Sequence, residues 1–259
     1  SNEKVIEKIS AITEKKIPFI QADIRDTDRI EQLIIQNNTQ AVIHFAGLKA
    51  VGESVDNPLE YFDNNVNGTI SLLKAMKKQN VKSLIFSSSA TVYGEPEYLP
   101  IDEEHPKQAT NPYGRTKLHI EEILSDLAAS DETWRIVCLR YFNPVGAHHS
   151  GLIGEDPNGT PNNLMPFISK VAAGELSHLE VFGDDYDTQD GSGVRDYIHV
   201  MDLVEGHAAA LNFLNKNNGW HAINLGTGNG LSVIEMVKAF EEASGKNVPY
   251  KFTNRRDRK

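Results

Sequence analysis

A tyrosine and a lysine four residues apart are the pair in this sequence best suited to acid–base chemistry. Tyr113 and Lys117 stand at the start of a predicted helix that follows Asn111-Pro112. Side chains four residues apart lie on one helix face, one turn from each other. A phenol has a reference pKa near 10, and an ammonium group within about 4 to 6 Å favours its ionised form. The spacing therefore indicates a phenolic base whose pKa is lowered by Lys117.

A serine-rich segment supplies a third group. Residues 87–91, Ser-Ser-Ser-Ala-Thr, follow an apolar run, and a helix that comes after this segment can bring Tyr113 towards Ser89. A tyrosine base, a lysine that keeps it ionised and a serine that shares the hydrogen bond form a proton relay to a substrate hydroxyl. Removing a hydroxyl proton is useful when hydride leaves the same carbon, and a nicotinamide cofactor accepts such a hydride.

Alternating helical and extended patterns position these groups. Apolar residues at helical spacing predict helices near residues 5–12, 26–36, 59–78 and 113–129, and apolar runs predict strands over 17–20, 41–46, 83–88 and 135–141. Strands that alternate with helices imply right-handed crossovers and a parallel sheet covered on both faces. The first half of the chain is therefore predicted to be an α/β domain with a doubly wound sheet.

Small or hydrogen-bonding residues follow each predicted strand. They occupy residues 22–24, 45–49, 87–91 and 141–144. Any strand needs turn-forming residues at its end, which is the simpler interpretation of a single exit. Ligands of an open parallel sheet bind beyond the carboxyl ends of its strands, so four such exits on one sheet edge favour a site.

The composition changes after Pro144. Gly, Pro, Asn and Asp cluster over residues 146–163 and 183–193. Apolar patterns between and after these loops predict helices over 164–173 and 233–243 and strands over 179–182 and 220–225. We therefore expect a second, smaller α/β lobe.

Charge and cysteine content exclude several classes of protein. The 259 residues include 26 basic and 36 acidic side chains, for a net charge of -10, which disfavours nucleic acid and anionic membranes as general partners. No apolar run approaches the roughly 20 residues that span a bilayer. The one cysteine, Cys138, lies in an apolar run and is expected to be a buried free thiol in a reducing, cytoplasmic compartment. No His or Cys spacing matches a metal site.

Seven segments carry a resemblance to a known family. They are HFAGLKAVGESV at 44–55, NNVNGT at 64–69, FSSSATVYG at 86–94, NPYGRTK at 111–117, RYFNPVGAH at 140–148, PNNLMP at 161–166 and DGSGVRDYIHVMDL at 190–203. Together they resemble the UDP-glucose 4-epimerases (UDP-galactose 4-epimerases), a family of extended short-chain dehydrogenases/reductases, along nearly the whole chain. Tyr-x-x-x-Lys marks only the superfamily, whereas the first and third segments are much more specific.

The resemblance implies an activity and a site. It implies NAD-dependent interconversion of UDP-glucose and UDP-galactose in galactose metabolism, with hydride moved from C4 to NAD and returned to the opposite face of a 4-keto sugar. Tyr113 would be the base and acid at the 4-hydroxyl, Ser89 would bind the same hydroxyl, and Lys117 would contact the nicotinamide ribose. The implied cofactor-binding residues are Asp23 and Ile24 beside the adenine, with Phe45, Ala46, Gly47, Leu48, Lys49, Asn64, Tyr113, Lys117 and Phe142.

The resemblance also assigns the UDP-hexose side. The implied substrate-binding residues are Ser89, Thr91, Tyr113, Asn143, Asn163, Leu164, Val181, Phe182, Arg195, Val233 and Arg256. A diphosphate needs cationic and preferably bidentate partners, and in an acidic chain Arg195 and Arg256 must supply them locally. A homodimer formed through helices over 59–78 and 113–129 is implied as well.

Both ends of the chain depart from the family pattern. The family begins with a strand and a glycine-rich turn at a helix start, which binds the NAD pyrophosphate, and residues 1–259 contain no such segment at the start. The run Gly226-Thr-Gly-Asn-Gly230 lies on the family's substrate side and is not expected to bind NAD. We expect an excerpt of a longer protein, with an incomplete, Rossmann-type NAD-binding domain at 1–144 that lacks its first βα unit, and a mainly UDP-sugar-binding lobe at 145–259.

Two other interpretations remain at this point. One is a related nucleotide-sugar dehydratase or UDP-glucuronate epimerase, although a dehydratase is expected to carry an acidic pair where Ala90-Thr91-Val92 stands. The other is a catalytically silent Rossmann scaffold that binds a nucleotide. Such a scaffold has no physical need for Ser89, Tyr113 and Lys117 together.

Overall fold

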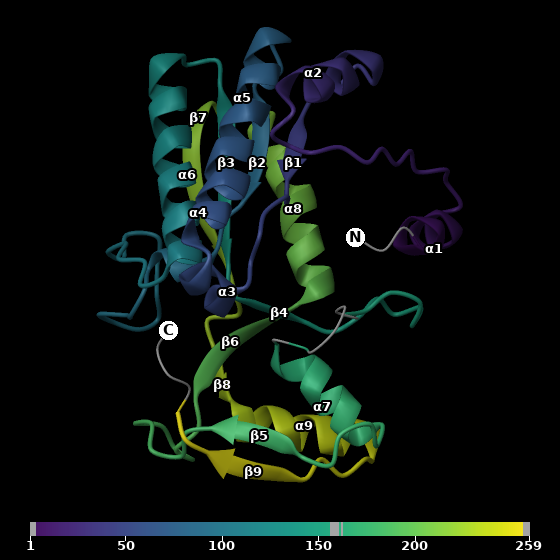
Figure 1. The fold of residues 1–259 in the computed structure, drawn as a ribbon, viewed down its shortest axis with the longest axis vertical. Coiled ribbons are helices and arrows are strands. Elements are labelled where there is room, and N and C mark those ends of the chain that lie inside the picture. The colour runs from purple at the N-terminus through teal and green to yellow at the C-terminus, as the bar shows by residue number, and fades with distance from the viewer. Residues whose placement is uncertain (1–3, 156–160, 162, 256–259) are drawn as a thin grey trace. The chain divides into compact units, whose positions relative to one another are not determined.

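The computed structural model describes residues 4–155, 161 and 163–255, and they form two compact units (Figure 1). The sheet unit comprises Lys16–Phe142 and Asp202–Leu225, and the cavity unit comprises Ser1–Lys15, Asn143–Met201 and Gly226–Lys259. The chain thus passes between the units several times, and a single division after residue 144 does not describe them. The assignment of NAD to the first half and UDP-sugar to the second stays a prediction.

A four-stranded parallel sheet forms the centre of the sheet unit. Its order is β1 (Val42–His44), β2 (Ser83–Ser87), β3 (Arg135–Tyr141) and β7 (Gly219–Leu225). β2 and β3 pair with Phe86 opposite Cys138, and both strands are almost entirely buried. Such β-branched and apolar runs, buried on both sides, are typical of parallel sheets covered by helices. The predicted α/β class with a parallel sheet is confirmed.

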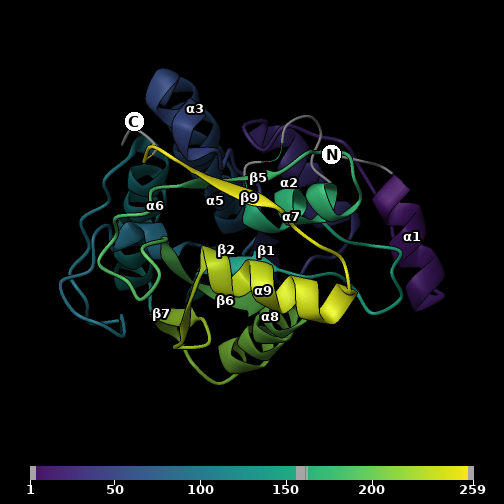
Figure 2. The same ribbon diagram turned by 90° about the horizontal axis from the view of Figure 1, so that it is seen from below.

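Helices cover both faces of this sheet (Figures 1 and 2). α2 (Thr27–Gln36), α5 (Gly68–Lys78) and α6 (Pro112–Ser130) pack their apolar sides on one face, around Leu84, Phe86 and Ile136. α8 (Val200–Leu214) packs Ala210 and Leu214 against the other face. Fully burying one such aliphatic side chain stabilises a fold by roughly 1.5 to 3 kcal/mol, so these two cores hold the strand exits in place.

Local signals set the helix that carries the tyrosine and lysine. Asn111 is the N-cap of α6, and its side chain accepts a hydrogen bond of 2.9 Å from the Gly114 amide. Pro112 stands at the first helical position, where its missing N–H costs nothing. Tyr113 is therefore held within the first turn of a 19-residue helix.

The predicted helix over residues 59–78 contains an irregular turn. α3 (Val51–Asp56) and α4 (Pro58–Tyr61) precede a π-helical segment, η1 (Phe62–Asn67), which continues directly into α5. π-helical turns place one extra residue in a helix and are frequent at functional sites. Here the turn carries Asn64 and the buried Asn65.

One predicted element in the sheet unit is wrong, and one helix was missed. Residues 17–20 do not form a strand, and Phe19 and Ile20 are exposed. None of the described strands pairs with this segment, and an apolar run becomes a strand only when a neighbour completes its hydrogen bonds. α8 was not predicted, because its apolar residues merge with those of the preceding strand.

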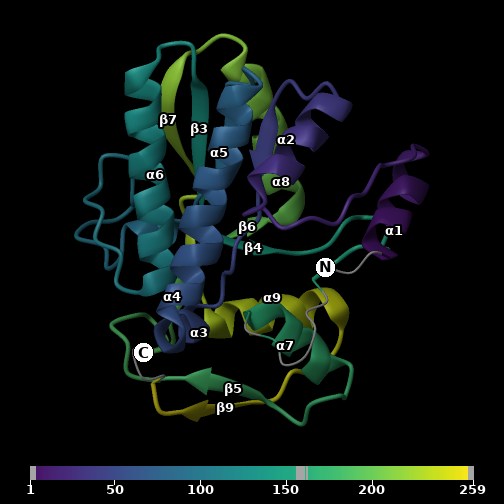
Figure 3. The same ribbon diagram turned by 45° about the horizontal axis from the view of Figure 1, so that its top comes forward.

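The cavity unit is built from shorter elements (Figure 3). β4 (Asn143–Val145), β6 (Val194–His199) and β8 (Gly230–Ser232) form one sheet, and β5 (Leu179–Phe182) pairs with β9 (Tyr250–Thr253). α7 (Leu164–Ala172) and α9 (Val233–Ser244) pack with β5 around Ile168, Val181 and Val237. α1 (Lys4–Thr13) completes the helices of this unit. Across both units, the described helices include none with the length and apolar character to span a bilayer.

Candidate active site

Tyr113 and Ser89 are brought together at the exit of β2. The Ser89 side chain lies near enough to the Tyr113 phenol to lower its pKa as a hydrogen-bond donor. The Tyr113 amide donates to Ser54 Oγ at 3.2 Å. Ser89 also caps the short helix η2 (Ala90–Val92), because its Oγ accepts from the Thr91 amide at 3.2 Å. The backbone of Tyr113 and the hydroxyl of Ser89 are thus each held by a hydrogen bond. The structure makes Tyr113 and Ser89 the polar pair that the sequence predicted.

The pKa of the Tyr113 phenol is raised rather than lowered. Burial raises it to about 12, the neighbouring Tyr141 adds to the increase, and the hydrogen bond from Ser89 opposes it. Lys117 Nζ lies 5.8 Å from the centre of the Tyr113 ring. The expected lowering by Lys117 is therefore wrong for the protein alone, because loss of hydration outweighs the attraction of the ammonium group.

Lys117 is a buried ammonium group with spare hydrogen-bonding capacity. Its side chain is almost fully buried, and burial lowers its pKa to about 8. Nζ donates to the Ser87 carbonyl at 2.7 Å and lies 4.8 Å from the centre of the Phe86 ring. In the described part of the chain the Ser87 carbonyl is its hydrogen-bond acceptor, whereas an ammonium carries three donors. Two donors therefore remain for hydroxyl groups of a ligand.

The short helix η2 also holds a buried hydroxyl group without a hydrogen-bond partner in the described part of the chain. Thr91 Oγ1 is buried and has no hydrogen-bond partner among the described groups. A buried hydroxyl without a partner costs free energy unless a ligand or water completes it. Thr91 belongs to the predicted substrate contacts, and its position beside Ser89 in η2 suits that assignment.

The predicted cofactor loop, residues 45–49, is joined to α6 through Asn65. The Leu48 amide donates to Asn65 Oδ1 at 2.8 Å, and Asn65 Nδ2 donates to the Leu48 carbonyl at 3.0 Å and to Thr116 Oγ1 at 3.1 Å. A Cβ on Gly47 would lie 3.2 Å from Asn65 Oδ1, so this approach suits glycine. Sequence reasoning missed Asn65, although the Asn-Asn doublet at 64–65 contained it.

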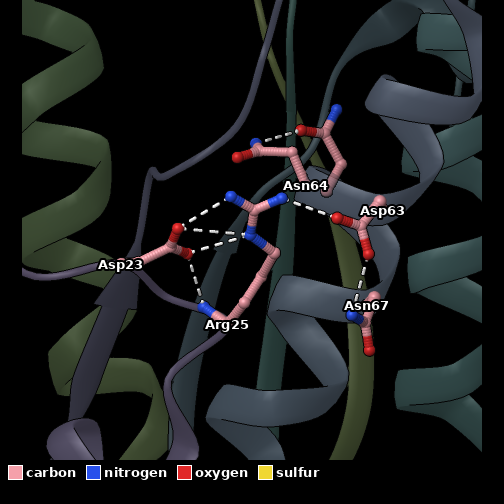
Figure 4. Close-up of polar contacts among 6 residues, drawn as sticks. Asp23, Arg25, Asp63, Asn64 and Asn67 are labelled. Atoms are coloured by element: carbon pink, nitrogen blue, oxygen red, sulfur yellow. Dashed lines mark hydrogen bonds and ion pairs between the residues drawn. The ribbon is translucent and has the colours of Figure 1, made fainter.

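Asp23 forms an ion-pair cluster that the sequence did not predict (Figure 4). Arg25 contacts the Asp23 carboxylate with Nη2 at 2.7 Å and Asp63 Oδ2 with Nη1 at 2.6 Å. The hydrogen bonds from Arg25 lower the pKa of Asp23 to about 2. Asn67 donates to Asp63 at 2.9 Å, and Asn64 lies beside this group on the same turn. The cluster is about half exposed, so its electrostatic contribution is modest.

Two further predicted cofactor residues, Ile24 and Phe142, have contacts outside the Asp23–Arg25–Asp63 cluster. Ile24 packs against the core of the sheet unit, next to Gly68. Phe142 donates its amide to the Leu225 carbonyl at 3.2 Å, at the carboxyl end of β3 and β7. Phe45, by contrast, is 57% exposed and stacks near His207, with 4.8 Å between ring centres. The loop therefore presents an apolar ring that a planar ligand can cover.

The cavity unit contains a hollow of about 580 Å³. Volumes of this size accommodate small ligands of nucleotide dimensions. Seven of the predicted substrate residues line it, namely Asn143, Asn163, Leu164, Val181, Phe182, Arg195 and Val233. The structure therefore brings these residues to one place, and it adds Tyr186, Tyr197 and His178, which the sequence did not indicate.

Arg195 is the exposed cation of this cavity. Its Nη1 donates to the Val194 carbonyl at 2.7 Å, and it forms no ion pair with any described residue. Arg255, by comparison, is paired with Asp185 at 2.6 Å. Its predicted companion, Arg256, lies outside the described residues. The side chain of Asn163 donates to Glu155.

The glycine-rich run at 226–230 is occupied by a carboxylate of the protein itself. Asp196 accepts hydrogen bonds from the amides of Thr227 and Gly228 at 2.9 Å and from Thr227 Oγ1 at 2.8 Å. These are the amides that an external phosphate would need. The Asp196 carboxylate thus takes the place that an external phosphate would need, and the loop is joined to β6 within the cavity unit.

The parallel sheet with a tyrosine and a lysine on α6 defines a class of nucleotide-dependent enzymes. The chain belongs to the NAD dependent epimerase/dehydratase family, whose model matches residues 2–226. This finding, with the comparisons below, confirms the resemblance inferred from the seven segments.

The particular relatives are UDP-glucose 4-epimerases. The enzyme of Bacillus subtilis is 57% identical over 256 residues, which cover 99% of this chain and 76% of that protein. A structure of the Stenotrophomonas maltophila enzyme with bound NAD and formylated UDP-arabinopyranose has a TM-score of 0.97 and 53% identity, covering 99% of this chain and 76% of that one. The Bifidobacterium longum enzyme in complex with NAD+ and UDP has a TM-score of 0.94, 55% identity and the same coverage. The Rossmann-type fold predicted for this chain is thereby confirmed.

Proposed function

We propose that this protein interconverts UDP-glucose and UDP-galactose with NAD as its cofactor. The observation that carries the proposal is the buried edge at which the Ser89 side chain acts on the Tyr113 phenol and Lys117 keeps two donors free. Proton transfer at a sugar hydroxyl needs a phenol within hydrogen-bond reach and a second group that orients it. The relatives named above are UDP-glucose 4-epimerases that bind NAD and UDP compounds. Galactose metabolism is the pathway in which we place this reaction.

The residues present fit a nicotinamide nucleotide. The free donors of Lys117 suit the two hydroxyls of a ribose, and Phe45 and the loop up to Lys49 offer an exposed apolar ring and polar backbone groups. Asn64, Phe142 and the Asp23–Ile24 pair are the further residues proposed to hold it. When bound, NAD supplies oxidation and re-reduction at C4 of the hexose.

The chain's own residues then manage the proton. Tyr113 Oη accepts the proton of the 4-hydroxyl and later returns it, while Ser89 Oγ holds that hydroxyl in line. A phenol whose pKa stands at about 12 is almost entirely protonated at neutral pH, so its ionisation must be assisted when the site is filled. Lys117 is charged below its pKa of about 8 and supplies part of that assistance. The pyridinium charge of a bound NAD would act in the same direction.

UDP is proposed to bind in the cavity unit. Arg195 offers an unpaired guanidinium for the diphosphate, and Arg256 is its proposed partner. Phe182, Val233 and Leu164 line the hollow with apolar surface for the nucleoside, and Asn143 and Asn163 add amide groups. Thr91 and Ser89 remain for the hexose. Firm binding of UDP and few contacts to the hexose leave the sugar free to present either face.

Replacing Tyr113 with phenylalanine tests the function. Tyr113→Phe removes the proton acceptor but keeps the ring, so conversion of UDP-galactose to UDP-glucose is expected to fall by about a thousandfold with UDP affinity unchanged. Tyr98→Phe, at an exposed phenol, is the matched control. Near-normal conversion by Tyr113→Phe would show that the proposed base is wrong, and no conversion by the unmodified protein would refute the function.

The alternative activities are not favoured. A dehydratase needs acidic groups beside the reacting carbon, whereas Thr91 and the buried Val92 follow Ser89 here. A silent scaffold leaves unexplained a buried ammonium group that destabilises the fold. UDP-glucose 4-epimerase activity accounts for both observations.

A homodimer and a cytoplasmic location complete the proposal. Leu59 on α4 is 83% exposed, and Phe62 contacts His119 of α6 with 5.6 Å between ring centres. The exposed apolar side chain of Leu59 supports an interface on these helices. Leu59→Glu is expected to yield monomers in sedimentation measurements, and an unchanged molar mass would oppose this interface. The buried free thiol of Cys138 suits the reducing cytoplasm.

A further inference from the structure

Two opposite charges are buried together beneath the proposed catalytic edge. Glu121 is 0% exposed and Arg140 is 1% exposed. Arg140 Nη2 donates to Glu121 Oε2 at 2.6 Å and Nε donates to Oε1 at 2.9 Å, a two-pronged contact between α6 and β3. Removing two charges from water costs several kcal/mol per ion, and apolar replacements of such pairs are often no less stable. Stability alone is therefore a weak reason for this pair.

The hydrogen bonds of the pair lead to the serine-rich exit of β2. Ser88 is fully buried and its Oγ donates to Glu121 Oε1 at 2.5 Å. Its amide donates to the Leu139 carbonyl at 2.9 Å, so Ser88 is held between α6 and β3. Ser89, the partner of Tyr113, is the next residue in the chain. A shift of Ser88 must therefore move the Ser89 hydroxyl.

One face of α6 contacts three consecutive serines. Tyr113, Lys117 and Glu121 are spaced four residues apart and share that face. Lys117 Nζ donates to the carbonyl of Ser87, and Glu121 accepts from the hydroxyl of Ser88. Tyr113 lies by the side chain of Ser89, which lowers the pKa of its phenol. The contacts of Lys117 and Tyr113 belong to the proposed proton relay. The contact of Glu121 is to Ser88, the serine between their two partners.

Arg140 contacts both carboxylate oxygens of Glu121 and also reaches the far end of the serine turn. Its Nη1 donates to the phenol of Tyr93 at 3.0 Å, and that phenol donates to Asn224 Oδ1 at 2.6 Å. Tyr93 is fully buried directly after η2, which Ser89 caps. The turn from Ser88 to Tyr93 is therefore bonded to the ion pair at both ends.

We propose that the Glu121–Arg140 pair is a positioning device that, through Ser88, holds the Ser89 hydroxyl against the Tyr113 phenol. The inference rests on the proposed function for its meaning in catalysis. Neither Glu121 nor Arg140 contacts a ligand in this scheme. Both act through the serine turn, and a misplacement of about 1 Å at a reacting group costs up to a hundredfold in rate.

Ser88→Ala in the full chain is the sharpest test. It removes only the hydroxyl that joins the turn to Glu121, and the ion pair stays intact. The expected result is a kcat for UDP-galactose lower by about tenfold, with KM unchanged, because the UDP contacts are elsewhere. Ser83→Ala removes a buried hydroxyl from the other end of β2 and is expected to leave both constants unchanged.

A second readout does not depend on turnover. The hydrogen bond from Ser89 lowers the Tyr113 pKa, so loosening Ser89 must raise it further. Phenolate absorbance is titrated in each protein and in the same protein carrying Tyr113→Phe, and the difference reports Tyr113. The charged or titratable groups near it, Tyr61, Lys117 and Tyr141, are the same in every pair.

The outcomes separate the inference from the function. A lower kcat at constant KM, with a Tyr113 titration moved to higher pH in Ser88→Ala but not in Ser83→Ala, supports the positioning role. Unchanged kcat and titration in Ser88→Ala, with an active unmodified protein, overturn it, and so does an equal loss in both serine variants. If the unmodified protein does not act on UDP-galactose, the function fails, and the titration still decides the positioning role. Arg140→Lys keeps the charge without the two-pronged contact and is expected to resemble Ser88→Ala.

Discussion

The polar groups of the sheet unit and of the cavity unit are built in opposite ways. At the exit of β2, Lys117, Ser88 and Glu121 are almost fully buried, and each is bonded to a strand or helix that packs on the sheet. In the cavity unit Arg195 is exposed, and its one described hydrogen bond goes to the neighbouring carbonyl. Buried groups keep a fixed geometry at a cost in hydration, whereas exposed groups adapt to what they bind. This difference suits the proposed function, in which the buried groups at the exit of β2 carry the proton transfer and the exposed Arg195 binds the diphosphate.

After Tyr113→Phe, the largest effect is expected at the buried ammonium group of Lys117. Lys117→Met keeps the length of the side chain and removes the charge, so kcat is expected to fall by about a hundredfold. The folded pKa of about 8 lies below the ordinary 10.5, so the unfolded chain binds the proton more tightly and the charge destabilises the fold below about pH 8. Chemical denaturation at neutral pH should therefore show a more stable variant. Lys74→Met, on the exposed side of α5, should change neither quantity.

The buried His44 predicts how the stability of the sheet unit depends on pH. Burial and the charge of Lys117 lower its pKa from 6.5 to about 3, and its Nε2 lies 2.9 Å from Thr69 Oγ1. The unfolded chain binds this proton first, so stability is lost as pH falls from about 6.5 towards 3, by up to about 1.4 kcal/mol per unit.

Denaturation curves at several values between about pH 7 and pH 5 measure this slope. His44→Gln removes the titrating group and should flatten the slope, while the exposed His149→Gln should keep it. An equal slope in the unmodified protein and in His44→Gln would contradict the burial argument.

The exposed Arg195 tests whether the cavity unit binds the diphosphate of the substrate. Arg195→Ala is expected to raise KM for UDP-galactose by about tenfold with little change in kcat, because the guanidinium contributes to binding rather than to the reacting bond. Arg195→Lys should recover part of the loss, since it keeps the charge without the planar fork. Arg255→Ala, which breaks the pair with Asp185, is the control. A fall in kcat alone would place Arg195 in the chemistry instead.

The smallest effect is expected at the exposed cluster of Asp23, Arg25 and Asp63. These side chains are 35 to 50% exposed, and ion pairs at such positions contribute little to folding. Arg25→Gln should leave the unfolding midpoint close to that of the unmodified protein, at low and at high salt. A large, salt-dependent shift would show that the cluster shares the rigidity of the buried edge.

Much of the fold could be predicted because its signals are local. Helical spacing and caps indicated α2, α6 and α9, and the apolar runs indicated β2, β3 and β5 within a residue or two. The run at 17–20 misled, because a strand needs a neighbour that no local pattern supplies. The π-helical turn at 62–67 was also beyond local pattern, since it depends on the contacts of the buried Asn65 with Leu48 and Thr116.

The residues of the proposed site could be named from the sequence, but their electrostatics could not. Spacing and family resemblance indicated Tyr113, Lys117 and Ser89, and the resemblance indicated the residues that line the cavity. The direction of the Tyr113 pKa was predicted wrongly, because hydration depends on everything packed around the phenol. Arg25 was missed for a related reason: its two partners are separated by 40 residues in the sequence.

The sequence by itself determined which chemistry is available, since residue type and helical spacing place Tyr113 and Lys117 on one face of α6 wherever that helix lies. It also determined the family through the seven segments. Only the tertiary structure decided that Glu121 and Arg140 are buried as a pair beneath three serines, and that Asp196 fills the glycine loop. These contacts join elements from distant parts of the chain, so their energies depend on packing and loss of water, which no local pattern encodes.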